Sequence, residues 1–365
     1  MKIKEITHYL EGIAPLSLQE SYDNAGLLTG NGETECQGII TSLDVTESVV
    51  EEAVQKKCNL IVAHHPIIFR GLKKLNGKNY VERTVIAAIK NDIAIYAIHT
   101  NLDNVSEGVN KKIAEKIGLE NCMALLPKEG TLQKLVTFSP VKNAEAVRNA
   151  LFQAGAGAIG KYDECSFNVK GTGTFKANEG SNPFVGNIGE RHDENEIRIE
   201  VIFPSRLQDK VVASLKEAHP YEEAAFYIHS LENVQAGIGS GLVGELKESI
   251  TEKQLFEILK SSFGLSLIKH TRFLENPVTK IAVCGGAGIF LLPNAIAAGA
   301  QVYVTSDIKY HEYFDADKRI LLADIGHYES EQFTIELLTD FLQQKFPNFA
   351  VLKTEMNTNP VKYFT

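Results

Sequence analysis

The sequence is poor in cysteine and has no long hydrophobic run. Its five cysteines are scattered and form no CxxC pair, which disfavours both a thiolate zinc site and a disulfide framework. No stretch reaches the roughly 18 consecutive apolar residues that a membrane-spanning helix needs. The first 15 residues resemble a short amphipathic helix and lack the apolar core and cleavage site of a signal peptide. We therefore expect a cytoplasmic protein with reduced thiols and no membrane partner.

Positive charge is also scarce. The chain has 37 Lys and Arg against 46 Asp and Glu, which gives a formal net charge of -9. Nucleic acids and anionic membranes attract positive surfaces, so this balance argues against non-specific binding to either. The 365 residues, 44% hydrophobic and 23% charged, are typical of a globular protein. At roughly 100–200 residues per domain, this length predicts two domains.

The two outer thirds of the chain alternate short apolar segments with amphipathic ones. Strands are expected at residues 38–45, 59–66, 93–103, 280–288, 301–307 and 319–328. Helices are expected between them, with Thr46 as one N-cap and Gly118 at one helix end. This rhythm predicts an α/β domain, discontinuous over residues 1–126 and 243–365. Its core would be one parallel-rich sheet with flanking helices.

The middle third, residues 127–242, has a different order. It reads as β-α-β-β-α-β, which is typical of an inserted α+β ferredoxin-like domain. Two glycine motifs occur nearby. The GTGTF segment (171–175) predicts a turn or bulge, and the GxGxxG match at 239–244 is a weak dinucleotide fingerprint because it follows no clear strand.

Residues that can bind metals collect where the predicted strands end. They are Asp44, His64, His65, His99, Asp103, Asp307 and His327, with Glu331 one helical turn further on. The carboxyl ends of parallel strands share one edge of a sheet, so we expect these side chains to lie close together. Histidines with carboxylates suit Zn²⁺, Mn²⁺, Fe²⁺ or Co²⁺ better than Ca²⁺ or Mg²⁺. The number of candidate ligands exceeds the need of one catalytic zinc, which favours two ions.

Each motif also has a purely structural interpretation. The adjacent His64 and His65 can serve two ions, one can bind a metal while the other supports a ligand, or both can hydrogen-bond to backbone in a loop. His327 and Glu331, spaced i and i+4, can chelate or bridge ions, or can be a capping histidine beside a solvated glutamate. His99 can orient a ligand, or can be a buried and satisfied histidine. The GGAG segment (285–288) can hold a phosphate, or can be a tight turn forced by close packing.

At these residues the sequence resembles the GTP cyclohydrolase 1 type 2 homologue family, also called Nif-three-like. The matching segments are SYDNAGLLTG (21–30), AHHPIIFRGLKKL (63–75), IHTNLDNVSEGVN (98–110), CGGAG (284–288), YVTSDIKYHEYFDA (303–316) and DIGHYESE (324–331). The middle third resembles the CutA-like inserted domain of the longer bacterial members. One departure is Tyr22, where many members have tryptophan.

The resemblance implies a centre of two divalent metal ions per chain. Its implied ligands are His64, His65, Asp103, His327 and Glu331. It also implies a toroidal homohexamer whose metal sites face an internal cavity.

Two functions follow as expectations. The first is a metal-dependent hydrolase acting on a nucleotide or related heterocycle, with His99 and Glu331 as catalytic candidates and GGAG or Lys309 holding a phosphate. The second is a non-enzymatic metal-binding regulatory or scaffold protein that acts through its inserted domain. A nucleic-acid-binding ring is disfavoured by the net charge of -9.

Overall fold

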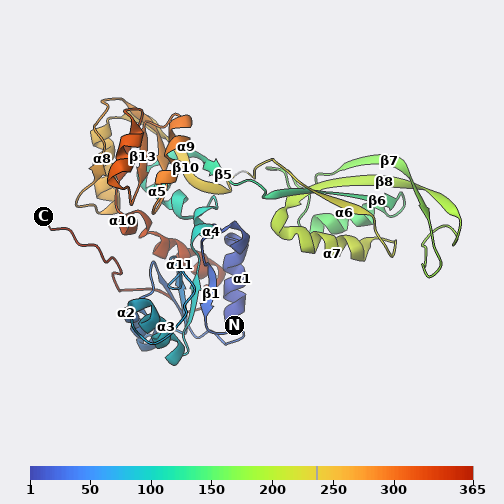
Figure 1. Cartoon of the computed structure of the whole chain (residues 1–365), viewed down its shortest axis with the longest axis horizontal. Coiled ribbons are helices and arrows are strands. Elements are labelled where there is room, and N and C mark those ends of the chain that lie inside the picture. Colours follow the sequence, from blue (N-terminus) through green and yellow to red (C-terminus); the bar gives the residue numbers. More distant parts are fainter. Residues whose placement is uncertain (236, 365) are drawn as a thin grey trace. The chain divides into compact units, whose positions relative to one another are not determined.

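The computed structural model describes residues 1–235 and 237–364 (Figure 1). The chain forms two compact units. The larger unit comprises Met1–Pro127 and Gly237–Thr365, and the inserted unit comprises Lys128–Ala236. Within the described residues, no helix is both long enough and apolar enough to cross a membrane.

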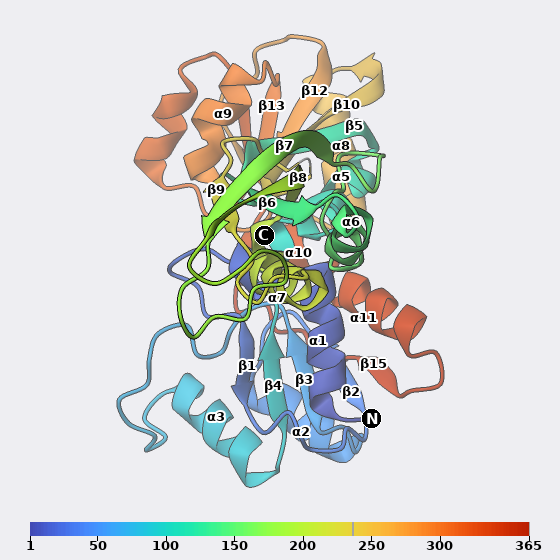
Figure 2. The ribbon, with the colours of Figure 1, turned by 90° about the vertical axis from the view of Figure 1, so that its right-hand side faces the viewer.

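The first sheet of the larger unit has five strands. In spatial order they are β1 (Gly26–Thr29), β4 (Ala94–Ala97), β3 (Leu60–Ala63), β2 (Ile39–Ser42) and β15 (Val351–Lys353). Figure 2 shows β1, β4, β3 and β2 side by side. All but β1 pair in parallel. The three central strands are buried along their whole length, as expected for apolar β-branched segments that helices cover on both faces.

The helices that accompany the first sheet are α1 (Ile3–Ile13), α2 (Glu47–Gln55), α3 (Tyr80–Lys90) and α11 (Thr334–Lys345). As predicted, the Thr46 side chain caps α2 by accepting a hydrogen bond from the Val49 amide.

The second sheet of the larger unit has six strands. In spatial order they are β11 (Lys269–His270), β14 (Leu321–Asp324), β13 (Val302–Thr305), β12 (Val278–Val283), β10 (Gly239–Ile250) and β5 (Leu119–Pro127). Its helices are α5 (Val109–Ile117), α8 (Glu252–Phe263) and α9 (Leu292–Ala297). As predicted, Gly118 ends α5 in the left-handed conformation. The GxGxxG match at 239–244 lies inside β10 and is therefore not a dinucleotide-binding turn.

The prediction of one parallel-rich sheet is wrong, because the outer thirds form two sheets. The long strand β10 pairs antiparallel with both β12 and β5, so these strands extend the second sheet and do not join the first. One buried cluster nevertheless contains residues of both sheets, including Leu60 and Tyr96 of the first and Val283 and Val302 of the second. Strand ends from both sheets can therefore still contribute to one site.

The predicted strand at 93–103 is also too long. It ends at Ala97, and Asp103 lies on the short helix α4 (Thr100–Asp103). The chain turns here because the Asp23 carboxylate accepts hydrogen bonds from the Thr100 amide and hydroxyl, while the Asn101 side chain accepts one from the His99 amide. Asp23 lies far away in the sequence, so no local pattern announces this turn.

The inserted unit has the predicted order of elements. They are β6 (Leu132–Pro140), α6 (Ala144–Gln153), β7 (Phe167–Lys176), β8 (Arg191–Pro204), α7 (Gln208–Ala218) and β9 (Phe226–Ser230). The strands form an antiparallel sheet in the order β7-β8-β6-β9. The prediction of a turn or bulge at 171–175 is wrong, since this segment pairs with β8 in an unbroken register.

Candidate metal centre

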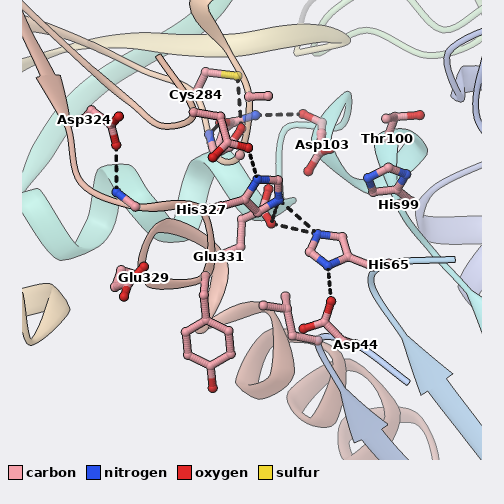
Figure 3. Close-up of a pocket in the computed structure, with 18 of the residues that line it drawn as sticks. Asp44, His65, His99, Thr100, Asp103, Cys284, Asp324, His327, Glu329 and Glu331 are labelled. Atoms are coloured by element: carbon pink, nitrogen blue, oxygen red, sulfur yellow. Dashed lines mark hydrogen bonds and ion pairs between the residues drawn. The ribbon is translucent and has the colours of Figure 1, made fainter. Parts of the chain in front are cut away.

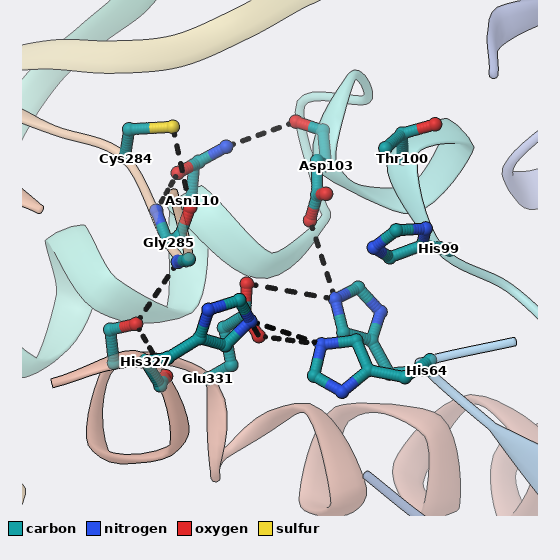
Figure 4. A network of polar contacts seen from close by, with 12 residues as sticks. His64, His99, Thr100, Asp103, Asn110, Cys284, Gly285, His327 and Glu331 are labelled. Carbon is teal, nitrogen blue, oxygen red and sulfur yellow. Dashed lines mark hydrogen bonds and ion pairs between the residues drawn. The ribbon is translucent and has the colours of Figure 1, made fainter. Parts of the chain in front are cut away.

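The five predicted ligands lie together at the carboxyl ends of strands from both sheets (Figure 3, Figure 4). His64 and His65 directly follow β3, and Asp103 ends α4. His327 and Glu331 are the first and last residues of α10 (His327–Glu331). Three combinations bring their possible ligand atoms within 4.8 Å of one another. These combinations are His64, Asp103 and Glu331; His65, His327 and Glu331; and His64, His65 and His99.

His64 and Asp103 each bring a buried ligand-type atom to this site. His64 is fully buried, and its Nδ1 donates to the Ile98 carbonyl oxygen at 2.8 Å. Its other ring nitrogen, Nε2, lies 3.7 Å from Asp103 Oδ1 and 3.9 Å from Glu331 Oε1. Within residues 1–235 and 237–364, neither His64 Nε2 nor Asp103 Oδ1 has a hydrogen-bond partner, although both atoms are buried. Buried polar atoms are rarely left unpaired, and ligand-type atoms at this spacing can share one metal ion.

A second group of atoms surrounds the other oxygen of Glu331. His65 Nε2 lies 2.9 Å and His327 Nε2 lies 3.1 Å from Glu331 Oε2, and the two nitrogens are 3.3 Å apart. The opposite ring nitrogens face carboxylates: His65 Nδ1 donates to Asp44 at 2.8 Å, and His327 Nδ1 donates to Asp307 at 2.7 Å. Acidic partners on Nδ1 orient imidazoles so that Nε2 can bind a metal. Glu331 thus presents one oxygen to each group of ligand atoms.

The protonation of the histidines shows how strongly this site attracts positive charge. Burial lowers the pKa of His65, but its hydrogen bonds to Asp44 and Glu331 outweigh this effect and raise it to about 9. Burial also lowers the pKa of His327, but the charge of Glu331 and the hydrogen bond to Asp307 outweigh it and raise the pKa to about 11. The surrounding carboxylates thus favour positive charge at this position, which a divalent ion could also supply.

The two carboxyl groups shift in opposite directions. Burial and the nearby Glu331 charge raise the pKa of Asp103 above its usual range. Burial also acts to raise the pKa of Glu331, but the charge and hydrogen bond of His327, with contacts from His64 and His65, hold it well below its usual range. Divergent pKa values of neighbouring buried groups are typical of functional sites.

His99 stands beside these ligands with its own acidic partner. Its Nδ1 donates to Asp23 Oδ1 at 2.7 Å, and its ring packs edge-on against those of His64 and His65. Burial opposes the charged form of Asp23, but its bonds to His99 and Thr100 lower its pKa to about 2. With Nδ1 held by Asp23, the Nε2 of His99 is the ring atom that could join His64 and His65 around a metal ion.

Three acids complete the site in roles that the sequence did not assign. Asp44 and Asp307 stand at predicted strand ends, but no pattern shows that each would accept a hydrogen bond from a histidine. Asp23 precedes β1 in a loop with no strand-end signal, and only its place in the resembling segment 21–30 marks it. Pairing partners that are distant in sequence emerge only from the fold.

The site opens into a cavity of about 680 Å³ in the larger unit. Its aromatic wall includes Tyr22 and Phe69, whose ring centroids lie 6.2 Å apart, and Phe69 is also 6.2 Å from His99. Lys269 lines the cavity, but its Nζ is paired with Asp324 at 2.5 Å. Lys309 is not among the described residues that line the cavity. Its side chain lies beside Glu312 and is 85% exposed. This placement does not support the expected phosphate contact of Lys309.

The GGAG segment (285–288) forms a tight turn against the ligands. Gly285 donates its amide to Asn110, and Gly286 donates to Ser330. Gly286 has φ +60, and a Cβ there would overlap the Glu331 carboxylate, so glycine is required for close packing. The amides are turned to the protein, which favours the structural interpretation of this motif over a phosphate cradle.

We expect Asp44→Asn to weaken metal binding about 10- to 100-fold, because the neutral amide holds His65 less firmly than the carboxylate does. The Asp44 carboxylate is itself positioned by the Thr358 hydroxyl, which donates to Oδ2 at 2.7 Å. Competition between the protein and a chelator for Zn²⁺ measures the change. Asp340→Asn, on the outer side of α11 and 57% exposed, is the matched control and should bind as the parent does. Equal affinities of the Asp44 variant and the parent would contradict this role.

Comparison with known proteins places this arrangement in a family. A curated protein of Halalkalibacterium halodurans, named GTP cyclohydrolase 1 type 2 homolog, is 39% identical over 363 residues and covers 98% of both chains. A protein of the same name from Bacillus subtilis is 35% identical over 365 residues, which cover 99% of this chain and 98% of the relative.

Solved structures agree with this comparison over the whole length. The crystal structure of a Bacillus cereus protein related to NIF3 matches with a TM-score of 0.87 and 37% identity, covering 100% of this chain and 99% of that one. A Staphylococcus aureus protein matches with a TM-score of 0.80 and 29% identity at the same coverage. The mixed α/β fold with several sheets is therefore shared. The sequence profile of one family matches residues 1–360, and the chain belongs to that family, Duf34/NIF3 (NGG1p interacting factor 3).

Proposed function

We propose that the chain binds two divalent transition-metal ions, of Zn²⁺, Mn²⁺, Fe²⁺ or Co²⁺ type. The proposed ligands are His64, His65, Asp103, His327 and Glu331. The observation that carries the proposal is a pair of buried atoms, His64 Nε2 and Asp103 Oδ1, which lie near Glu331 Oε1 and have no hydrogen-bond partner in the described part of the chain. Nitrogen and oxygen donors of this kind suit these metals. Bound ions of this class supply Lewis acidity and activate water for hydrolysis.

We further propose that the cavity carries out metal-dependent hydrolysis of a nucleotide or related heterocycle. Three features support this substrate class: the volume of about 680 Å³, the exposed rings of Tyr22 and Phe69, and the GTP cyclohydrolase 1 type 2 homolog name of the relatives. The rings offer a surface on which a planar base can stack. His99, held by Asp23, is placed to give or take a proton at its Nε2, and Glu331 orients the imidazoles around it.

The second candidate function is non-enzymatic, with metal binding in the larger unit and regulation through the inserted unit. A separate cavity in the inserted unit favours it. We propose that the two units are independent domains and that the inserted one is ferredoxin-like, of the CutA type. The β-α-β-β-α-β order and the antiparallel sheet support that assignment. By resemblance, we also propose a cytoplasmic homohexamer.

Turnover decides between the two candidates. The purified chain is loaded in turn with Zn²⁺, Mn²⁺, Fe²⁺ and Co²⁺, and the purine absorbance of GTP is followed over time. We expect turnover with at least one metal and a loss of about 100-fold or more in His65→Ala, because metal-ligand groups act together on the transition state. Equal turnover in the His65 variant would remove the metal centre from the reaction. Absence of turnover with every metal would favour the regulatory function.

A further inference from the structure

The inserted unit contains a cavity of about 690 Å³ that the metal chemistry does not use. Glu196 and Arg198 of β8 line it, and they alternate with Ile197 and Ile199, which belong to the hydrophobic core. Neighbouring residues of a strand point to opposite faces of the sheet. The core also contains residues of α6 and α7, so the cavity lies on the face that these helices leave uncovered (Figure 1).

The floor of the cavity surrounds one buried carboxylate, that of Glu196. Glu196 is only 8% exposed, and its Oε1 accepts a hydrogen bond from the Tyr221 hydroxyl at 2.9 Å. A Cβ at Gly173 would overlap Glu196 Oε2, so glycine is needed to let the carboxylate lie across β7. At Gly171, directly opposite Glu196 in the register, no atom lies within 4 Å of a Cβ position. The GTGTF segment therefore leaves a flat and open strip of backbone beside the carboxylate.

Aromatic rings form the walls of this cavity. The rings that line it are Phe138, Phe175, Phe184, Tyr221 and Tyr227. The centroid of Tyr221 lies 6.0 Å from that of Phe175 and 6.2 Å from that of Phe184, and Phe138 lies 6.0 Å from Tyr227. Rings grouped in this way around an open strip offer faces on which a planar molecule can stack.

Acidic side chains dominate the cavity face. Glu196, Glu222 and Glu223 line the cavity, and Arg198, the base beside them, is paired with Glu200 at 2.8 Å. Lys170 and Lys176 alternate along β7 with Gly171 and Phe175 of the cavity face, and Lys170 lies opposite the core residue Ile197, so both lysines belong to the other face of the sheet. This distribution disfavours a polyphosphate and favours a ligand that donates hydrogen bonds to carboxylate oxygens.

We propose that this cavity binds a planar nitrogen heterocycle that stacks on the aromatic rings and donates N–H groups to the Glu196 carboxylate. The site lies wholly within the inserted unit and is independent of the metal centre. It gives that unit a ligand-binding role of its own. Guanosine is a suitable probe because its base is planar and presents neighbouring N–H donors on one edge. Caffeine is the comparison probe, because its purine ring is also planar but its methylated nitrogens leave no N–H donor.

Calorimetric titration of the full-length chain with guanosine tests the proposal. We expect the parent to bind guanosine, and Glu196→Gln to bind it about tenfold more weakly or worse, because the charged acceptor is lost. Glutamine can still accept the Tyr221 hydrogen bond, so the fold should be kept. Glu217→Gln is the control: this exposed residue lies on α7 and is not among the residues lining the cavity, so the variant should bind as the parent does. Phe184→Ala, at a ring that is 45% exposed, should also weaken binding.

Three results would overturn the proposal. They are a parent protein that does not bind guanosine, a Glu196→Gln variant with unchanged affinity, and caffeine bound as tightly as guanosine. Metal content is measured on every variant and should be unchanged. A failure of this site is thereby distinguished from a failure of the metal centre.

Discussion

His65→Ala is expected to lower the metal content from about two ions per chain to about one. His65 belongs to the group with His327 and Glu331 Oε2, and its loss removes a nitrogen ligand there. The other group, His64 and Asp103 with Glu331 Oε1, stays intact. Plasma mass spectrometry of protein equilibrated with Zn²⁺ and freed of excess metal measures the difference.

Asp103→Ala is the complementary variant and should also leave about one ion, because it disrupts only the His64 group. Its fold should survive, since Asp103 Oδ1 has no hydrogen-bond partner within the described residues. His311→Ala, at a histidine outside the cavity, is the control and should keep the full complement. If either ligand variant retains as much metal as the parent, the assignment of that residue is wrong.

Glu331→Gln should have a larger effect and abolish binding of both ions, with affinity falling by about 100-fold or more. One carboxylate oxygen faces each group of ligand atoms, so a single substitution affects both. Glutamine keeps the volume that the turn at Gly286 accommodates, but it removes the negative charge. The same chelator competition with Zn²⁺ measures this loss.

The matched control for this substitution is Glu329→Gln, two residues away. The Glu329 carboxylate accepts a hydrogen bond from Asn359 at the rim of the same cavity. This variant should bind metal as the parent does. Retention of one ion in Glu331→Gln would show that Glu331 serves a single ion, and retention of two would exclude it as a ligand.

The position of the proposed ligands could be predicted because strand ends and helix starts leave local signals. His64 and His65 end an apolar strand before a proline, and His327 and Glu331 share one helical turn. These residues come from two sheets. They still lie in one site, because a common hydrophobic core joins the two sheets. The number of sheets could not be predicted, since the antiparallel pairing of β10 with β5 and β12 depends on contacts between distant segments.

The acidic partners of the histidines could not be predicted from the sequence either, because these pairs also join distant segments. Asp23 and Asp44 hold His99 and His65 across long separations in the chain, and neither lies in a repeating pattern. In the inserted unit, the GTGTF sequence around Gly173 predicts a turn or bulge. The actual role of Gly173, room for the Glu196 carboxylate, requires knowledge of the strand pairing. The local sequence thus predicts the candidate metal-binding side chains, whereas the fold determines which acids position them.

Elemental analysis of the purified, unchelated protein by plasma mass spectrometry tests the central claim most directly. The arrangement of His64, Asp103, His65 and His327 around Glu331 predicts about two transition-metal ions per chain. A protein that is isolated without metal, and that also fails to bind added Zn²⁺, Mn²⁺ or Fe²⁺, would contradict the two-metal centre.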